Sequence, residues 1–218
     1  MKKLVIFDVD GTILNTIPTI SYHVNSSLEH FGLKKLDESQ YRYILGYGSY
    51  YLINEAIKLS KGEYLEKNEV EEVLNYYDKL YRDNPLYLTE SYDGIEDLFR
   101  ELKKRGYLLA CYSNKQHGVL TKVIDQFYKE NWFDYVLGQK KGMIGKPDPK
   151  GLYDILEHLN ISKEEAILIG DTEVDINTGK NAGVYTIACT WGFRTKEDLE
   201  KLSPNAIIGE AKEVLNYL

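Results

Sequence analysis

Two aspartates at the end of the first apolar run have the spacing for nucleophilic chemistry. Asp8 and Asp10 directly follow the run Leu4–Phe7, within the segment Asp8-Val9-Asp10-Gly11-Thr12. A carboxylate can attack phosphorus to form an acyl phosphate, while a second carboxylate two residues later handles the proton of the leaving group. The same segment also fits an Asp-Gly turn between two strands. On these residues alone, both interpretations stay open.

A hydroxyl and an amide follow another apolar run. The run Leu108–Tyr112 precedes Ser113, Asn114 and Lys115, which we expect at the start of a helix. The side chains of Ser113 and Asn114, together with the backbone N–H groups of a helix start, could hold phosphoryl oxygens. Either side chain could equally be an ordinary helix cap, and the segment taken alone favours the cap.

Lys146 lies in a segment that favours a loop. Pro147 keeps the preceding lysine extended, while Asp148 and Pro149 suit the cap and the first position of the next helix. Lys146 could therefore supply a positive charge beside a phosphate. Taken alone, it could equally be a solvated surface lysine.

Acidic side chains again follow a predicted strand at residues 170–175. The run Ala166–Ile169 ends in Gly170-Asp171-Thr172-Glu173-Val174-Asp175. Asp171 suits a hard cation such as Mg²⁺, which prefers one or two carboxylates and keeps several waters. Acidic residues are also favoured at a helix N-terminus by the helix dipole. Both roles are compatible, and we expect Asp175 to support the site without binding the metal directly.

Short apolar runs alternate with helix-period segments through most of the chain. Apolar residues recur at helical spacing in segments 95–102 and 152–159. Gly106 is the expected C-terminal cap of the first of these two helices. This alternation predicts an α/β fold with a doubly wound parallel sheet, whose ligands bind beyond the carboxyl ends of the strands. The predicted strands are residues 4–7, 108–112, 135–137, 166–169, 185–188 and 206–208.

Residues 15–85 carry only helical patterns. We therefore predict a helical domain of residues 15–85 inserted into a core domain of residues 1–14 and 86–218. The insertion is rich in tyrosine, and residues 46–51, with two glycines beside tyrosines, are a candidate substrate-facing turn. The alternative is that most of the tyrosines pack between helices with their hydroxyls in water.

Composition limits the class of partner. The 218 residues carry a net charge of −7 with both signs interleaved, so we expect no broad positive face for nucleic acid. Asp8 and Asp10 cut the first apolar run too short for an export or membrane segment, which indicates a cytoplasmic protein. Cys111 and Cys189 lie in apolar runs, where buried thiols are expected and a disulfide or metal pair is not.

Four of these segments, taken in their order along the chain, resemble the motifs of the haloacid dehalogenase-like hydrolase superfamily. A helical insertion directly after the first motif resembles the C1-cap subgroup, which includes phosphoglycolate phosphatases, related pyrophosphatases and beta-phosphoglucomutases. The segments 179–184 and Trp191-Gly192 are similar to the phosphoglycolate phosphatase branch. The resemblance spans essentially the whole chain and implies a Rossmann-like core with an α-helical cap domain. The four motif segments are residues 8–12, 113–114, 146–147 and 170–172 with Asp175.

The resemblance also implies roles for individual residues. Asp8 would be the nucleophile and a Mg²⁺ ligand, and Asp10 the general acid and base that offers its backbone carbonyl to the metal. Asp171 would complete the protein ligands of the metal, with Asp175 supporting them. Many C1-capped members have an acidic residue where this chain has Asn15-Thr16, which weakens a substrate borrowed from them. The implied substrate-binding residues are Thr12, which supports the loop, Ser113, Asn114 and Lys146, which also steadies Asp8.

These observations predict a Mg²⁺-dependent phosphatase that hydrolyses a small phosphorylated metabolite through an aspartyl-phosphate, similar to phosphoglycolate phosphatase. A beta-phosphoglucomutase-like phosphotransferase and an inorganic pyrophosphatase are the enzymatic alternatives, and a non-catalytic binding protein is a third class. Asp10 argues against a carbon-halogen hydrolase, because a leaving halide needs no proton. We expect no nucleic-acid or membrane partner, and a monomer or weak homodimer.

Overall fold

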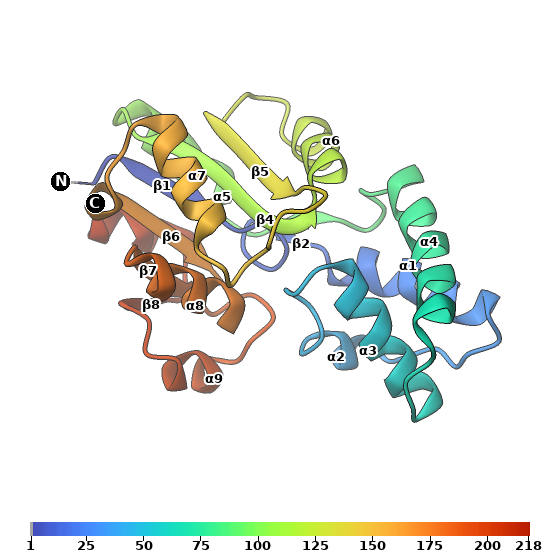
Figure 1. Ribbon diagram of the computed structural model, residues 1–218. Helices are drawn as coiled ribbons and strands as arrows, with labels where there is room; N and C mark the ends of the chain where they lie inside the picture. Colours follow the sequence, from blue (N-terminus) through green and yellow to red (C-terminus); the bar gives the residue numbers. More distant parts are fainter. Residues whose placement is uncertain (1) are drawn as a thin grey trace. The chain divides into compact units, whose positions relative to one another are not determined.

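The computed structural model describes residues 2–218 and has the predicted α/β fold (Figure 1). Six parallel strands form one sheet in the order β5-β4-β1-β6-β7-β8, so that β1 lies between β4 and β6. All six predicted strands are therefore confirmed. Their bounds are β1 (Leu4–Phe7), β4 (Leu108–Gln116), β5 (Tyr135–Gln139), β6 (Ala166–Gly170), β7 (Tyr185–Cys189) and β8 (Ala206–Ile208).

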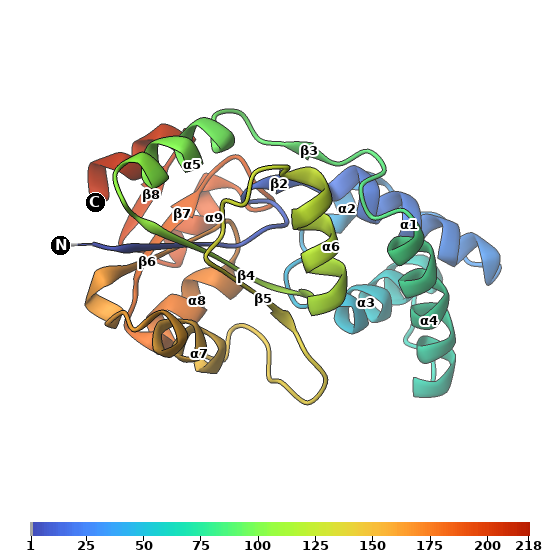
Figure 2. The ribbon, with the colours of Figure 1, turned by 90° about the horizontal axis from the view of Figure 1, so that it is seen from above.

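Helices cover both faces of this sheet, as Figure 2 shows for α7 and α8 on one face and α5 on the other. Side chains of β1 alternate between the faces: Leu4 and Ile6 pack in the cluster that contains Leu152 and Ile155 of α7, whereas Phe7 contacts Phe99 of α5 edge to face. The part of the chain that contains this sheet has the helices α5 (Ile95–Lys104), α6 (His117–Phe127), α7 (Lys150–Leu159), α8 (Glu173–Ala182) and α9 (Lys196–Lys201), with short 3₁₀ helices at Lys163–Glu165 and Ala211–Tyr217.

The prediction that Ser113 begins a helix is wrong. Strand β4 continues to Gln116, and α6 begins at His117. Gln116 pairs with Gln139 of β5, and the register of the pairing shifts between Tyr112 and Gln116. Pairing with β5 thus keeps residues 113–116 in the strand, although local capping preferences would place them at a helix start.

The predicted start of α7 is one residue too early. The helix begins at Lys150, and Pro149 occupies the N-cap position. Asp148 lies before the cap, where its Oδ1 accepts a hydrogen bond of 2.9 Å from the backbone N–H of Lys150. The side chain of Asp148 therefore serves the helix start from outside the helix.

A second compact unit comprises residues Thr16–Glu90, and the first comprises the residues up to Asn15 and Ser91–Leu218. These divisions lie later in the chain than the predicted borders at 14/15 and 85/86. The reason at the second border is that Thr19 in α1 donates to the carbonyl of Tyr87 and hydrogen-bonds to Thr89, which ties residues 87–89 to the helical unit. The short strands β2 (Leu14–Asn15) and β3 (Glu90–Ser91) pair with each other.

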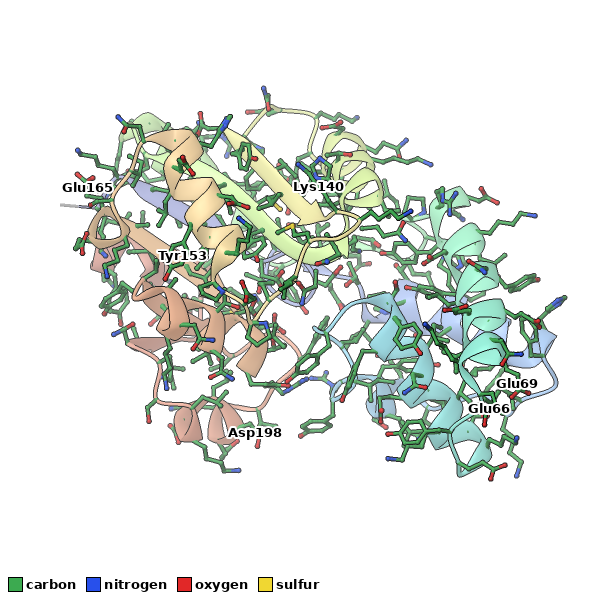
Figure 3. The ribbon with its side chains drawn as sticks, viewed as in Figure 1. Glu66, Glu69, Lys140, Tyr153, Glu165 and Asp198 are labelled. Carbon is green, nitrogen blue, oxygen red and sulfur yellow. The ribbon has the colours of Figure 1, made fainter. Side chains whose placement is uncertain are left out.

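Four helices form this second unit: α1 (Ile17–His30), α2 (Glu38–Tyr41), α3 (Ser49–Lys61) and α4 (Lys67–Asp83). Helix α4 begins with a reciprocal cap, in which Glu69 accepts from the backbone N–H of Glu66 at 3.1 Å (Figure 3). No helix of residues 2–218 is long and apolar enough to cross a membrane.

The tyrosines of the helical unit differ in burial. Tyr41, Tyr77 and Tyr81 are buried and Tyr76 is partly buried, whereas the exposed group is Tyr22, Tyr43, Tyr47, Tyr50, Tyr51, Tyr64 and Tyr87. Within the candidate turn at 46–51, both glycines have positive φ, and α3 begins at Ser49. Its substrate-facing role stays a prediction.

Candidate functional site

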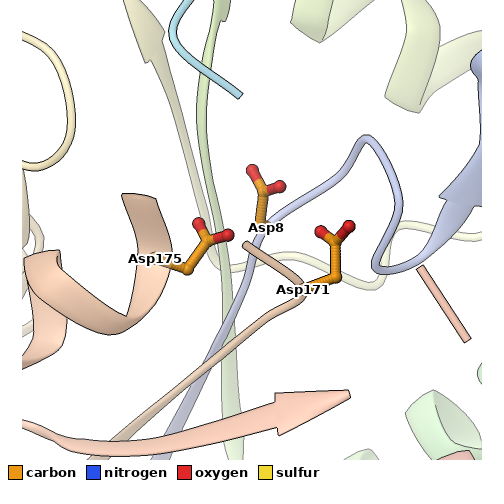
Figure 4. A group of neighbouring side chains, drawn as sticks. All are labelled: Asp8, Asp171 and Asp175. Atoms are coloured by element: carbon orange, nitrogen blue, oxygen red, sulfur yellow. The ribbon is translucent and has the colours of Figure 1, made fainter. Parts of the chain in front are cut away.

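Three carboxylates meet at the carboxyl edge of the sheet (Figure 4). Asp8 follows β1, Asp171 follows β6, and Asp175 lies in the first turn of α8. One oxygen from each carboxylate lies within 4.8 Å of one oxygen from each of the other two, and all three side chains are buried. The backbone N–H of Asp8 donates to Ile169 at 2.9 Å, which joins the ends of β1 and β6. The structure therefore brings together Asp8 and Asp171, which are far apart along the chain.

Lys146 lies inside this cluster, so it is not a solvated surface lysine. Its Nζ donates to Asp8 Oδ1 at 2.7 Å, to Asp175 Oδ1 at 2.6 Å and to the carbonyl of Tyr112 at 3.1 Å. Burial acts to lower the pKa of Lys146, but the carboxylates of Asp175 and Asp8 raise it above its ordinary value. The side chain is therefore a fixed cation between two carboxylates.

Asn114 holds the backbone of Lys146 from both sides. Its Nδ2 donates to the Lys146 carbonyl at 2.9 Å, and its Oδ1 accepts from the Lys146 N–H at 2.7 Å. The amide thus satisfies both backbone groups of a buried loop residue, a contact that the sequence analysis did not predict. Asn114 is in β4 and is not a helix cap.

Asp171 is oriented by two donors from different segments. Thr12 Oγ1 donates to its Oδ1 at 3.0 Å, and the backbone N–H of Phe193 donates to its Oδ2 at 2.7 Å. Trp191 Nε1 in turn donates to the Thr12 carbonyl at 2.9 Å. The hydroxyl of Thr12, predicted to support its loop, therefore reaches the Asp171 carboxylate.

The loop after β7 is a part of the site that sequence reasoning missed. A Cβ on Gly192 would lie 2.3 Å from Asp171 Cβ and 2.4 Å from the Gly11 carbonyl, so a side chain has no room there. The loop therefore packs directly against the first and fourth motif segments. The available signal was Trp191-Gly192 three residues after the predicted strand 185–188, at the edge where ligands bind.

Asp175 has both oxygens engaged by protein donors. Its Oδ2 accepts from the backbone N–H of Thr172 at 3.2 Å and from the Thr172 hydroxyl at 2.8 Å, while its Oδ1 accepts from Lys146. Thr172 is the N-cap of α8, so Asp175 closes a capping box. These contacts suit the predicted supporting role, and the helix-terminus interpretation holds as well.

Asp10 lies at the rim of the site and pairs with a lysine that sequence reasoning did not select. Lys115 Nζ lies 2.8 Å from Asp10 Oδ1. Ser113 is buried nearby in the same segment, and its Oγ accepts from the backbone N–H of Lys115 at 3.3 Å. The only signal for Lys115 was its place directly after Ser113 and Asn114.

Burial and mutual repulsion make the ionised forms of these carboxylates costly. Burial, together with the charges of Asp175 and Asp10 and against the opposing effect of Lys146, raises the pKa of Asp8 to about 7. Burial, with Asp175 and Asp8, raises the pKa of Asp171 well above its ordinary value, although Phe193 and Thr12 oppose this. The ligand set contains oxygen only, which fits a hard divalent cation such as Mg²⁺. Asp8 and Asp171 would supply carboxylate oxygens to such a cation.

We expect Mg²⁺ to stabilise the protein more at about pH 8 than at about pH 5.5. With raised pKa values, the metal-free folded state holds protons that the unfolded chain has released, so its stability falls as pH rises from about 4 to about 7. A bound cation replaces those protons and offsets the loss. The measurement is the melting temperature with and without Mg²⁺ at both pH values, with NaCl of equal ionic strength as control. Equal Mg²⁺ shifts at both pH values would contradict the prediction.

Known proteins are similar to this chain over most or all of its length. The sequence profile of the haloacid dehalogenase-like hydrolases matches residues 5–189. A phosphoglycolate phosphatase of Psychrobacter arcticus is 30% identical, covering 100% of this chain and 96% of its own, and one of Haemophilus influenzae is 27% identical, covering 99% and 98%. A crystal structure of a protein from Lactobacillus delbrueckii subsp. bulgaricus has a TM-score of 0.94 at 28% identity, covering 100% of this chain and 98% of that chain.

Proposed function

Because the chain belongs to the haloacid dehalogenase-like hydrolase family, we propose that it is a Mg²⁺-dependent phosphatase acting on a small phosphorylated metabolite. The observation that carries this proposal is the meeting of Asp8, Asp171 and Lys146 at one edge of the sheet. Relatives named phosphoglycolate phosphatase match almost the whole chain, which supports phosphoglycolate or a similar small phosphate monoester as the substrate.

In the proposed reaction, an oxygen of Asp8 attacks phosphorus and the bond to the leaving oxygen breaks. Asp10 gives its proton to that oxygen, which departs as an alcohol and leaves an aspartyl-phosphate. Asp10 then takes a proton from water as the water attacks phosphorus. The bond between phosphorus and Asp8 breaks, releasing inorganic phosphate and restoring the Asp8 carboxylate.

Charge neutralisation is the main requirement for attack by an anion on an anion. Lys146 supplies a cation 2.7 Å from the nucleophilic carboxylate. Asp8, Asp171 and the backbone carbonyl of Asp10 would hold Mg²⁺, which when bound would offset charge on the phosphoryl oxygens. Thr12 serves by orienting Asp171, and Asp175 by holding Lys146.

The proposal also gives roles to the remaining predicted residues and to the helical unit. Ser113, buried near the end of β4, would bind phosphoryl oxygens, and Asn114 would act through the backbone of Lys146. The helical unit, predicted as residues 15–85, would form the cap that selects the substrate. Within it, residues 46–51 are the proposed substrate-facing turn.

Phosphate release from a panel of compounds tests the proposal. Purified protein with Mg²⁺ should release phosphate from p-nitrophenyl phosphate and from small alkyl phosphates such as 2-phosphoglycolate. Excess EDTA should stop turnover, and added Mg²⁺ should restore it. Isomerisation of a hexose 1-phosphate would indicate a mutase, and preference for pyrophosphate a pyrophosphatase. No turnover across the panel would refute a catalytic role.

A further inference from the structure

Each aspartate of the first motif segment has its own lysine partner. Lys146 binds Asp8, whereas Lys115 Nζ lies 2.8 Å from Asp10 Oδ1. The Lys115 side chain is 8% exposed and that of Asp10 is 16% exposed, so this pair differs from a solvated surface ion pair. The structure therefore places a second, largely buried cation at the proposed site.

Hydrogen bonds fix the backbone of the turn at residues 9–14, so it is mainly the Asp10 side chain that can change its orientation. The backbone N–H groups of Thr12, Ile13 and Leu14 all donate to the Val9 carbonyl, at 3.0–3.2 Å, so the turn that carries Asp10 is internally bonded. The side-chain torsions of Asp10 remain to be fixed, and the electrostatic attraction of an ammonium 2.8 Å from Oδ1 restricts them. Lys115 therefore contacts the adjustable part of the loop.

Lys115 is itself held by the irregular end of β4. Its backbone N–H donates to Ser113 Oγ at 3.3 Å, and a Cβ on Gly138 of β5 would lie 2.7 Å from the Lys115 carbonyl. The close approach of the two strands thus fixes the backbone from which Lys115 reaches Asp10. The side chain of the preceding residue, Asn114, hydrogen-bonds to the backbone N–H and carbonyl of Lys146. Neighbouring residues of β4 therefore hold the backbones of both lysines.

We propose that Lys115 is a positioning residue for Asp10, holding its carboxyl group in the orientation in which it meets the leaving oxygen. A general acid must lie within hydrogen-bond reach of the atom that it protonates, so a freely rotating Asp10 would meet this condition less often. The inference rests on the proposed phosphatase function. It predicts that Lys115 affects substrates in proportion to their need for a proton.

The test compares kcat/KM on two substrates for Lys115→Met, which keeps a long side chain and removes the charge. This constant reports the steps up to transfer of the phosphoryl group to Asp8. We expect kcat/KM on an alkyl phosphate to fall by about 10²-fold, because acid catalysis contributes about 10²–10⁴-fold. On p-nitrophenyl phosphate, whose leaving group needs little protonation, we expect a change within about threefold. Lys115→Arg, which keeps the charge, should recover part of the alkyl-phosphate rate.

A double variant and a matched control separate positioning from general damage. If Lys115 acts through Asp10, adding Lys115→Met to Asp10→Asn should leave the ratio of the two kcat/KM values unchanged. Lys103 forms a comparable 2.7 Å pair with Asp134 at the start of β4, where Asp134 also accepts from the backbone of Leu109. Lys103→Met should leave the wild-type ratio unchanged.

The outcomes distinguish this inference from the proposed function on which it rests. A wild-type protein without Mg²⁺-dependent turnover would refute the proposed function. An active wild-type protein with equal losses on both substrates in Lys115→Met would overturn the positioning role, as would a further change of the ratio in the double variant. If Lys115→Met does not fold, Lys115→Arg and Lys115→Gln supply the same comparison, and an alkyl-phosphate deficit only in Lys115→Gln supports the role.

Discussion

Asp8→Asn should abolish steady turnover, lowering kcat by about 10⁴-fold or more. The amide has nearly the size of the carboxylate but cannot form the acyl phosphate, and loss of a catalytic nucleophile has effects of this order. The variant should nevertheless fold, because burial makes ionised Asp8 costly and Lys146 keeps its contact with Asp175. The measurements are phosphate release with Mg²⁺ and the melting temperature without metal at about pH 8, where the variant should be at least as stable as wild type.

A matched carboxylate outside the site supplies the control for Asp8→Asn. Asp134 pairs with Lys103 at 2.7 Å and caps the start of β4, so Asp134→Asn also removes one paired carboxylate. This control should keep wild-type kcat. Full activity of Asp8→Asn would rule out the aspartyl-phosphate mechanism, and an unfolded Asp8→Asn protein would contradict the argument from burial.

Lys146→Met should affect both stability and activity. Removing the ammonium leaves Asp8 and Asp175 without the cation that now lies 2.7 Å and 2.6 Å from them. Breaking a buried ion pair by removing one partner costs about 3–5 kcal/mol. We expect a loss of this size in the free energy of unfolding of the metal-free protein, measured by urea denaturation, and a fall in kcat of about 10²–10³-fold with Mg²⁺ bound.

Two further variants show whether such effects come from Lys146 itself. Asn114→Asp keeps an acceptor for the Lys146 N–H but loses the donor to its carbonyl, so it should displace the lysine and lower kcat by about tenfold. Lys150→Met removes an exposed lysine that pairs with Asp154, and should change neither quantity. A folded Lys146→Met protein with wild-type stability and kcat would contradict the proposed role of Lys146.

The six strands could be predicted because strands buried on both faces are short apolar runs bounded by polar residues. The same pattern placed Asp8 and Asp171 at strand ends, although it could not say that β1 and β6 are neighbours. The prediction failed at Ser113, where β5 extends β4 by pairing with Gln116. It was one residue early at α7, because Pro149 took the cap position expected for Asp148.

By itself, the sequence determined which side chains stand at the ends of the strands and therefore what chemistry they can perform. Only the tertiary structure decided their partners: Lys115 with Asp10, Asn114 with Lys146, and the loop at Trp191–Phe193 with Asp171. The physical reason is range. Hydrophobic periodicity and turn preferences act between residues a few positions apart, whereas these contacts join segments that only strand order, register and packing bring together.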